Sequence, residues 1–185
     1  MRSLHRGSKF FAMGLISLLV SSCSTYHNDG GTLQYSANSF SSDYSSRLPD
    51  HIDTGGKKVV VVDPSVHAWG AYGPDGSLIK AGIATAGGNW CPDINRPCRT
   101  SVGTFRINSL GDGQCVSRIY PKPHGGGLMP YCMYFSGGQA LHGSPDGAVV
   151  EDNISHGCVR MRIVDAEWLR YNFASVGTKV IVRPY

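Results

Sequence analysis

Charged side chains are scarce in this 185-residue chain, where Asp, Glu, Lys and Arg together make up 16% of the residues. No acidic residue precedes Asp29, whereas Arg2, Arg6 and Lys9 lie close to the start. Setting these three aside leaves fourteen basic residues against thirteen acidic ones, a formal charge of +1. Such a balance offers no basic surface to a polyanion, so we expect no nucleic-acid partner.

Long hydrophobic runs are also missing. The apolar run at residues 10–20 is about half as long as the roughly 20 residues that a membrane-spanning helix needs. A basic start precedes it and Cys23 follows, a pattern that predicts an export signal over residues 1–22. Residues 20–23 resemble the lipobox of bacterial lipoproteins, which implies acylation of Cys23. Because Ser24 rather than Asp follows, the resemblance implies the periplasmic face of the outer membrane. A plain signal peptide with a coincidental cysteine is the alternative.

The next segment contains no heptads, low-complexity repeats or sustained periodicity. Residues 23–56 are instead rich in Ser, Asn, Gly and Tyr. This composition buries too little apolar surface to offset the entropy lost on ordering. We therefore predict that residues 23–56 hold the acylated Cys23 and a flexible tether, followed by one domain at residues 57–185. The lipid anchor would be the protein's only contact with the membrane.

Short strand patterns dominate the predicted domain. They occur at residues 58–63, 66–72, 78–85, 104–108, 115–120, 130–135, 139–142 and 179–182. A Pro-Asp-Gly turn joins the second and third, and Gly-Asp-Gly lies between the fourth and fifth, which predicts two hairpins. One helix is indicated, capped by Asp165, with Trp168, Leu169 and Phe173 on one face. The predicted fold is mainly β, a sandwich or curled mixed sheet with one packed helix near the C-terminus.

The cysteine count is odd once Cys23 is set aside. Exported proteins fold in an oxidising compartment, where cysteines usually pair. Five cysteines remain, so at least one stays free or pairs with another molecule. Four cysteines allow three pairings. We favour Cys91–Cys98, which bracket a short loop, and Cys115–Cys132, which fall on or beside predicted strands, and this choice leaves Cys158 free.

The surroundings of Cys158 suggest a reactive thiol. The sequence Ser-His-Gly-Cys-Val-Arg spans residues 155–160, and a second His-Gly pair stands at residues 142–143. A nearby imidazole or cation lowers the pKa of a thiol and activates the sulfur for attack on a carbonyl. Gly157 leaves room for backbone amides to approach an oxyanion, and Arg160 can bind a carboxylate through its planar fork. The alternative is a buried, unreactive thiol near two structural histidines.

These motifs carry a resemblance to a known family. His-Gly at residues 142–143, followed by Ser-His-Gly-Cys-Val-Arg at residues 155–160, resembles the signature of bacterial L,D-transpeptidases with a YkuD-type catalytic domain. The likeness covers most of residues 57–185. Two positions differ from the family pattern: Ser101 replaces the usual Pro, and Cys132 stands where an aromatic residue is common.

The resemblance implies a specific reaction. Cys158 would attack the third-residue carbonyl of a tetrapeptide stem of peptidoglycan and release the terminal D-alanine. The acyl group would then pass to an amine of another stem, giving a 3–3 crosslink, to a protein lysine, or to water. The family is generally acylated by carbapenems as well. We expect no metal or organic cofactor, and a monomeric protein.

The resemblance also assigns roles to individual residues. His142 is expected to act as general base and then acid, with the carbonyl of Gly143 orienting its ring. His156 would support the oxyanion site, to which the backbone of Gly157 would contribute. The residues expected to contact the substrate are Arg160, Tyr131 and Ser155.

Two other functions stay open. His142, His156 and Cys158 are all zinc-ligand types, which makes a zinc hydrolase the first alternative. Zinc ligands at His156 and Cys158 would be cramped, however, and no His-Glu-x-x-His motif occurs. The second alternative is a non-catalytic envelope lipoprotein that binds peptidoglycan or a host surface through the same cleft. Such a binder would have no need of a reactive cysteine.

Overall fold

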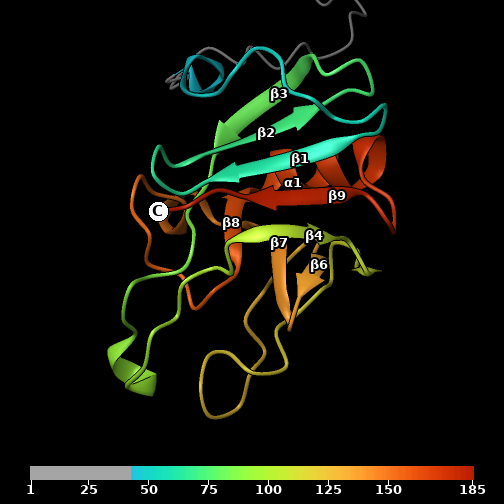
Figure 1. Ribbon diagram of the computed structural model, residues 1–185. Coiled ribbons are helices and arrows are strands. Elements are labelled where there is room, and N and C mark those ends of the chain that lie inside the picture. The colour runs from blue at the N-terminus through green and yellow to red at the C-terminus, as the bar shows by residue number, and fades with distance from the viewer. Residues whose placement is uncertain (1–42) are drawn as a thin grey trace, which may run out of the picture. The chain divides into compact units, whose positions relative to one another are not determined.

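The computed structural model describes residues 43–185, which form two β-sheets and one helical segment near the C-terminus (Figure 1). The predicted signal at residues 1–22, the lipidation site Cys23 and residues 24–42 of the predicted tether lie outside the described residues. Among the residues that are described, no helix is long and apolar enough to cross a membrane.

The larger sheet has five strands in the order β3-β2-β1-β9-β4. Its central strand β1 pairs in parallel with β9, and the other pairs are antiparallel. The continuous β-branched run of β1 is buried along its whole length, as expected of a strand covered on both faces. The strands are β1 (Val59–Asp63), β2 (Ala68–Tyr72), β3 (Leu78–Ile83), β4 (Gly103–Arg106) and β9 (Lys179–Val182).

The smaller sheet has four strands in the order β5-β6-β7-β8. β7 and β8 are parallel to each other, and the other two pairs are antiparallel. This sheet carries the motif residues on β7 and at the start of β8. The strands are β5 (Ser109–Leu110), β6 (Met133–Ser136), β7 (Gln139–Ser144) and β8 (Val159–Arg162), with a short 3₁₀ turn η3 (Asp146–Ala148) after β7.

The helical segment packs into the main core together with both sheets. It consists of α1 (Ile163–Trp168) and a following π-helical turn η4 (Leu169–Phe173). Asp165 does not cap the helix as predicted, because α1 begins two residues earlier and the Asp165 carboxylate pairs with Lys80 Nζ at 2.8 Å. The core joins helix residues to strand residues of both sheets, among them Ala166, Leu169, Val60, Trp69, Leu141 and Met161. The predicted mainly β fold with one helix is therefore confirmed.

The segment before β1 is ordered, which corrects the predicted tether. Residues 43–56 contain a 3₁₀ turn, η1 (Tyr44–Arg47), and pack against the larger sheet. Tyr44 and Leu48 are buried in a small apolar cluster, and the carbonyl of Pro49 accepts a hydrogen bond from the Tyr72 hydroxyl at 2.8 Å. The prediction of a flexible tether is therefore wrong for residues 43–56, because these few apolar side chains anchor the segment without forming a periodic pattern.

The second predicted hairpin is also wrong. β4 pairs with β9 and β5 pairs with β6, while residues 115–120 form no strand and make only a single bridge, from Val116 to Leu128. The structure places these residues in a loop at 111–132, which the Cys115–Cys132 disulfide closes. In Figure 1 this loop and the loop at 84–102, which carries η2 (Pro92–Ile94), project from the same end of the domain.

Candidate active site

The two residues predicted to perform the chemistry come from neighbouring parallel strands. His142 lies on β7 opposite Arg160 of β8, and Cys158 immediately precedes β8. All three side chains line one cavity of about 350 Å³. Parallel pairing thus brings the two motifs together, and the cavity is lined by a thiol, an imidazole and a guanidinium.

His142 is held in one protonation state and one tautomer. Its Nδ1 lies 2.8 Å from the carbonyl oxygen of Gly143. A carbonyl only accepts hydrogen bonds, so Nδ1 carries the proton and Nε2 is free to accept one. Burial lowers the pKa of His142 to about 4, against a smaller opposing effect of the Gly143 carbonyl. The His142 ring is therefore neutral at pH 7 and is oriented by the Gly143 carbonyl, as the resemblance implied.

The low pKa of His142 predicts acid-dependent stability. Between about pH 6.5 and pH 4 the unfolded chain binds a proton at His142 that the folded protein does not bind. The free energy of unfolding should therefore decrease as the pH falls through this window, by about 3 kcal/mol in all. Denaturant unfolding at pH 7 and pH 4.5 measures this, with His142→Gln as the comparison. A variant that loses as much stability as the wild type would contradict the assignment.

Cys158 differs from its predicted state. Within residues 43–185 it is the only cysteine outside a disulfide. Burial raises the pKa of the Cys158 thiol, although the backbone amide of Ala140 and the charge of Arg160 act in the opposite direction. The expectation of a lowered thiol pKa is therefore wrong for the resting protein. A neutral thiol and a neutral imidazole therefore line the same cavity in the resting protein. Attack by this sulfur would require its proton to leave at the same time.

Hydrogen bonds fix the turn that presents Cys158. The Ser155 hydroxyl donates to the Cys158 carbonyl and accepts from the Gly157 amide at 3.1 Å. The carbonyl of Gly157 accepts from the Thr100 hydroxyl at 2.9 Å. Gly157 has φ +115°, where a Cβ would also stand 2.9 Å from Gln139 Nε2, so the turn requires glycine here.

This turn corrects two predicted roles. The Gly157 amide, predicted to face the oxyanion, is already bonded to the Ser155 hydroxyl. Ser155, predicted to contact the substrate, is buried, and its hydroxyl forms both of these hydrogen bonds within the turn. Both residues shape the turn around Cys158, and neither supplies a free donor in this arrangement. The sequence shows only that these residues are adjacent, and the turn conformation that pairs these donors and acceptors appears only in the fold.

Of the residues predicted to contact the substrate, Arg160 lines the cavity and Tyr131 does not. None of the ion pairs in residues 43–185 involves Arg160, and its half-buried guanidinium shares the cavity with His142. Such a cation is available to an incoming carboxylate. Tyr131 lines neither this cavity nor the neighbouring one. Its hydroxyl donates instead to Glu167 at 2.9 Å, so the prediction that Tyr131 contacts the substrate is wrong.

A second, larger cavity of about 950 Å³ meets the first at Cys158. Cys158, His156, Tyr120, Ser117 and Met129 line both cavities. Four arginines and a single carboxylate, from Asp112, also line the larger cavity, which gives it a positive charge. These arginines are Arg96, Arg99, Arg118 and Arg170. One sulfur thus faces two compartments of different charge and size.

Comparisons with known proteins identify a family for this chain. A family model described as the L,D-transpeptidase catalytic domain, YkuD, matches residues 57–182. The chain belongs to this family. Among solved structures, an L,D-transpeptidase from Xylanimonas cellulosilytica has 25% identity and a TM-score of 0.61, covering 75% of this chain and 66% of that one. One from Mycobacterium smegmatis has 25% identity and a TM-score of 0.56, covering 69% and 59%. No curated protein sequence matches. The chain spans less than two thirds of either solved relative.

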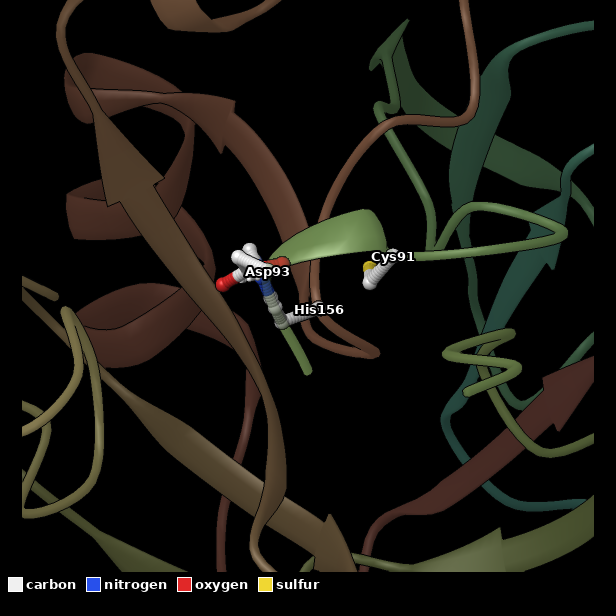
Figure 2. A group of neighbouring side chains, drawn as sticks. All are labelled: Cys91, Asp93 and His156. Carbon is white, nitrogen blue, oxygen red and sulfur yellow. Dashed lines mark hydrogen bonds and ion pairs between the residues drawn. The ribbon is translucent and has the colours of Figure 1, made fainter. Parts of the chain in front are cut away.

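One potential metal-ligand group occurs among the described residues of this YkuD-family protein, and it differs from the zinc set weighed above. The ligand atoms of Cys91, Asp93 and His156 lie within 4.8 Å of one another (Figure 2). The Cys91 sulfur is bonded to Cys98, however, and is not a thiolate.

Both disulfides are the pairings that the sequence favoured.

Three residues near the site were missed by sequence reasoning. Asp93 bonds to His156, and Tyr120 packs on the same ring. Gln139, on β7, accepts a hydrogen bond from the Ser101 amide at 2.9 Å and so ties the loop at 84–102 to the strand. The only sequence signal was that Asp93 stands inside the loop closed by the predicted Cys91–Cys98 pair.

Proposed function

We propose that this protein is a peptidoglycan L,D-transpeptidase. The observation that carries the proposal is the shared cavity of Cys158, a neutral His142 and an Arg160 that has no partner ion among the described residues. Family membership supports the same reaction class. The substrate is the tetrapeptide stem, attacked at the carbonyl of its third, L-centred residue.

The protons follow from the charge states of the two side chains. As the Cys158 sulfur attacks the carbonyl, its proton passes to Nε2 of His142. The carbon–nitrogen bond to D-alanine then breaks, and the leaving amine takes that proton from His142. A thioester remains on Cys158. An acceptor amine next loses a proton to His142 while it attacks the thioester, and the departing sulfur recovers that proton.

The position of His142 in the smaller cavity determines which cavity each substrate occupies. The leaving amine and the acceptor amine both exchange a proton with His142, so both occupy the smaller cavity. The donor stem then lies in the larger cavity, whose arginines complement the free carboxylates of a stem. Cys158 lies where the two cavities meet, as the transfer requires.

Arg160 favours one class of acceptor. In the smaller cavity its guanidinium accompanies His142, so the pair suits an amine with a carboxylate on the same carbon. Released D-alanine has this arrangement, and so has the side-chain end of a diaminopimelate stem. A 3–3 crosslink is therefore the first product that we propose. Transfer to a protein lysine and hydrolysis by water are the alternatives.

Release of D-alanine from a defined stem tests the proposed reaction. The purified protein and a diaminopimelate tetrapeptide should give free D-alanine together with a dimer lighter than two stems by one D-alanine. A tetrapeptide with a D-centred third residue is the matched control and should give neither product. Equal turnover of the two stereoisomers would rule out L,D-transpeptidation.

We propose that the protein acts as a lipoprotein at the periplasmic face of the outer membrane. The lipobox-like residues 20–23 and the basic start of the chain support this location. His142, Cys158 and Arg160 come from one chain, which supports a monomer. Labelling with radioactive palmitate in wild type and Cys23→Ala tests the anchor, because only the wild type should carry label.

A further inference from the structure

His156, two residues before the proposed nucleophile Cys158, has an acidic partner in a loop that is distant in the sequence. His156 Nε2 lies 2.8 and 2.9 Å from the two carboxylate oxygens of Asp93, and Figure 2 shows the two side chains in contact. An ionised carboxylate only accepts hydrogen bonds, so this ring nitrogen carries a proton. The hydrogen bond from His156 is the largest cause of the lowered pKa of Asp93, which keeps the carboxylate charged. His156 Nε2 is therefore a donor and cannot act as a base.

The position of Asp93 depends on a disulfide. Asp93 lies in the short turn η2, inside the loop that Cys91 and Cys98 close. Besides the disulfide, three backbone hydrogen bonds close this loop: the Cys91 amide donates to the Arg96 carbonyl at 3.0 Å, and the amides of Ile94 and Asn95 donate to the carbonyls of Cys91 and Pro92, each at 3.3 Å. Half of the Asp93 side chain is exposed, so packing by neighbouring residues does not by itself hold it against His156.

The other side of the His156 ring contacts the second loop. The Tyr120 ring lies 4.5 Å from it, centroid to centroid. Tyr120 belongs to the loop at 111–132 and lines both cavities beside Cys158. His156 is thus held between Asp93 of one loop and Tyr120 of the other, two residues before the nucleophile.

We propose that Asp93 is a positioning residue for the proposed transpeptidase reaction. Held by the Cys91–Cys98 disulfide, its carboxylate fixes the His156 ring, and that ring in turn fixes the Cys158 turn and the Tyr120 wall of the two cavities. The inference rests on the proposed function. An exposed ion pair adds little to the free energy of unfolding, so the role we propose for the Asp93–His156 pair is to orient the His156 ring. A displacement of about 1 Å at a reacting atom can cost about 10²-fold in rate.

The test measures acylation of Cys158 by a carbapenem in the full chain. Asp93→Ala should lower the maximum acylation rate by about 10- to 100-fold, with a smaller change in the half-saturating concentration. Asp93→Asn keeps an acceptor oxygen and should recover part of the loss. Alkylation by iodoacetamide, which needs no alignment in the site, should proceed at the wild-type rate. Asp152→Ala is the matched control, because Asp152 lines the same outer surface but does not bond to His156.

A second variant tests the role of the disulfide. Cys91→Ser with Cys98→Ser should slow acylation to a similar extent, and adding Asp93→Ala should slow it little further, because both changes act through one contact. Wild-type acylation by Asp93→Ala, or losses that add fully, would overturn the inference. If the wild type itself takes up no carbapenem and no stem, the proposed function fails, and this inference fails with it.

Discussion

The Cys158→Ala variant should form no covalent adduct with a carbapenem, while the wild type gains the mass of one drug molecule. Without the Cys158 sulfur no thioester can form, and loss of the attacking group in a serine protease lowers turnover by about 10⁶-fold. The thiol lies at the boundary of two cavities, so its loss should barely change the melting temperature. Intact mass spectrometry measures the adduct.

The control for this experiment uses the other cysteines. Within residues 43–185 the remaining four are in disulfides, and Cys23 stands outside these residues. Cys23→Ala should therefore keep the adduct in full. An adduct that persists in Cys158→Ala would mean that a different side chain attacks the drug, and the assignment of the nucleophile would be wrong.

The His142→Ala variant should be acylated about 10²- to 10⁴-fold more slowly than the wild type at pH 7. The wild-type thiol loses its proton to His142 during attack, and the variant has no base in reach. Burial raises the pKa of Cys158, so only a small fraction of the variant is thiolate at neutral pH. Stopped-flow measurement of carbapenem acylation gives the rates.

The pH dependence separates a lost base from a disturbed fold. The wild-type rate should stay nearly level as the pH falls from 7 to 5 and decline only near pH 4, where His142 takes up its proton. The variant's rate should instead climb with pH above the usual thiol range, as thiolate forms. His124→Ala, on the exposed loop, is the control and should keep the wild-type profile. A parallel profile in His142→Ala and wild type would exclude His142 as the base.

Part of the lining of the smaller cavity could be predicted from the sequence, because it belongs to the two motifs. The motifs lie within 19 residues, the first on β7 and the second at the start of its parallel neighbour β8. The two disulfides could also be predicted, because Cys91 and Cys98 bracket a short loop and Cys115 and Cys132 fall on or beside predicted strands. The resemblance implied that the Gly143 carbonyl orients the His142 ring, and the structure contains this contact.

Features that depend on tertiary contacts could not be predicted from the sequence. Asp93 and Tyr120 reach His156 from two loops whose positions no periodicity encodes. The alternation at residues 115–120 predicted a strand, but a disulfide-closed loop formed instead. The raised pKa of the Cys158 thiol could not be predicted from the sequence, because burial outweighs the neighbouring cation and burial is a property of the fold.

We expect Cys158 to take an acyl group from a peptidoglycan stem. The most direct test is the intact mass of the purified protein shortly after mixing with a diaminopimelate tetrapeptide, followed by digestion to locate the change. We predict a gain equal to the tetrapeptide minus D-alanine, on the peptide that contains Cys158. A thiol that iodoacetamide alkylates readily but that never gains this mass would contradict the claim, and would favour a protein that binds peptidoglycan without cutting it.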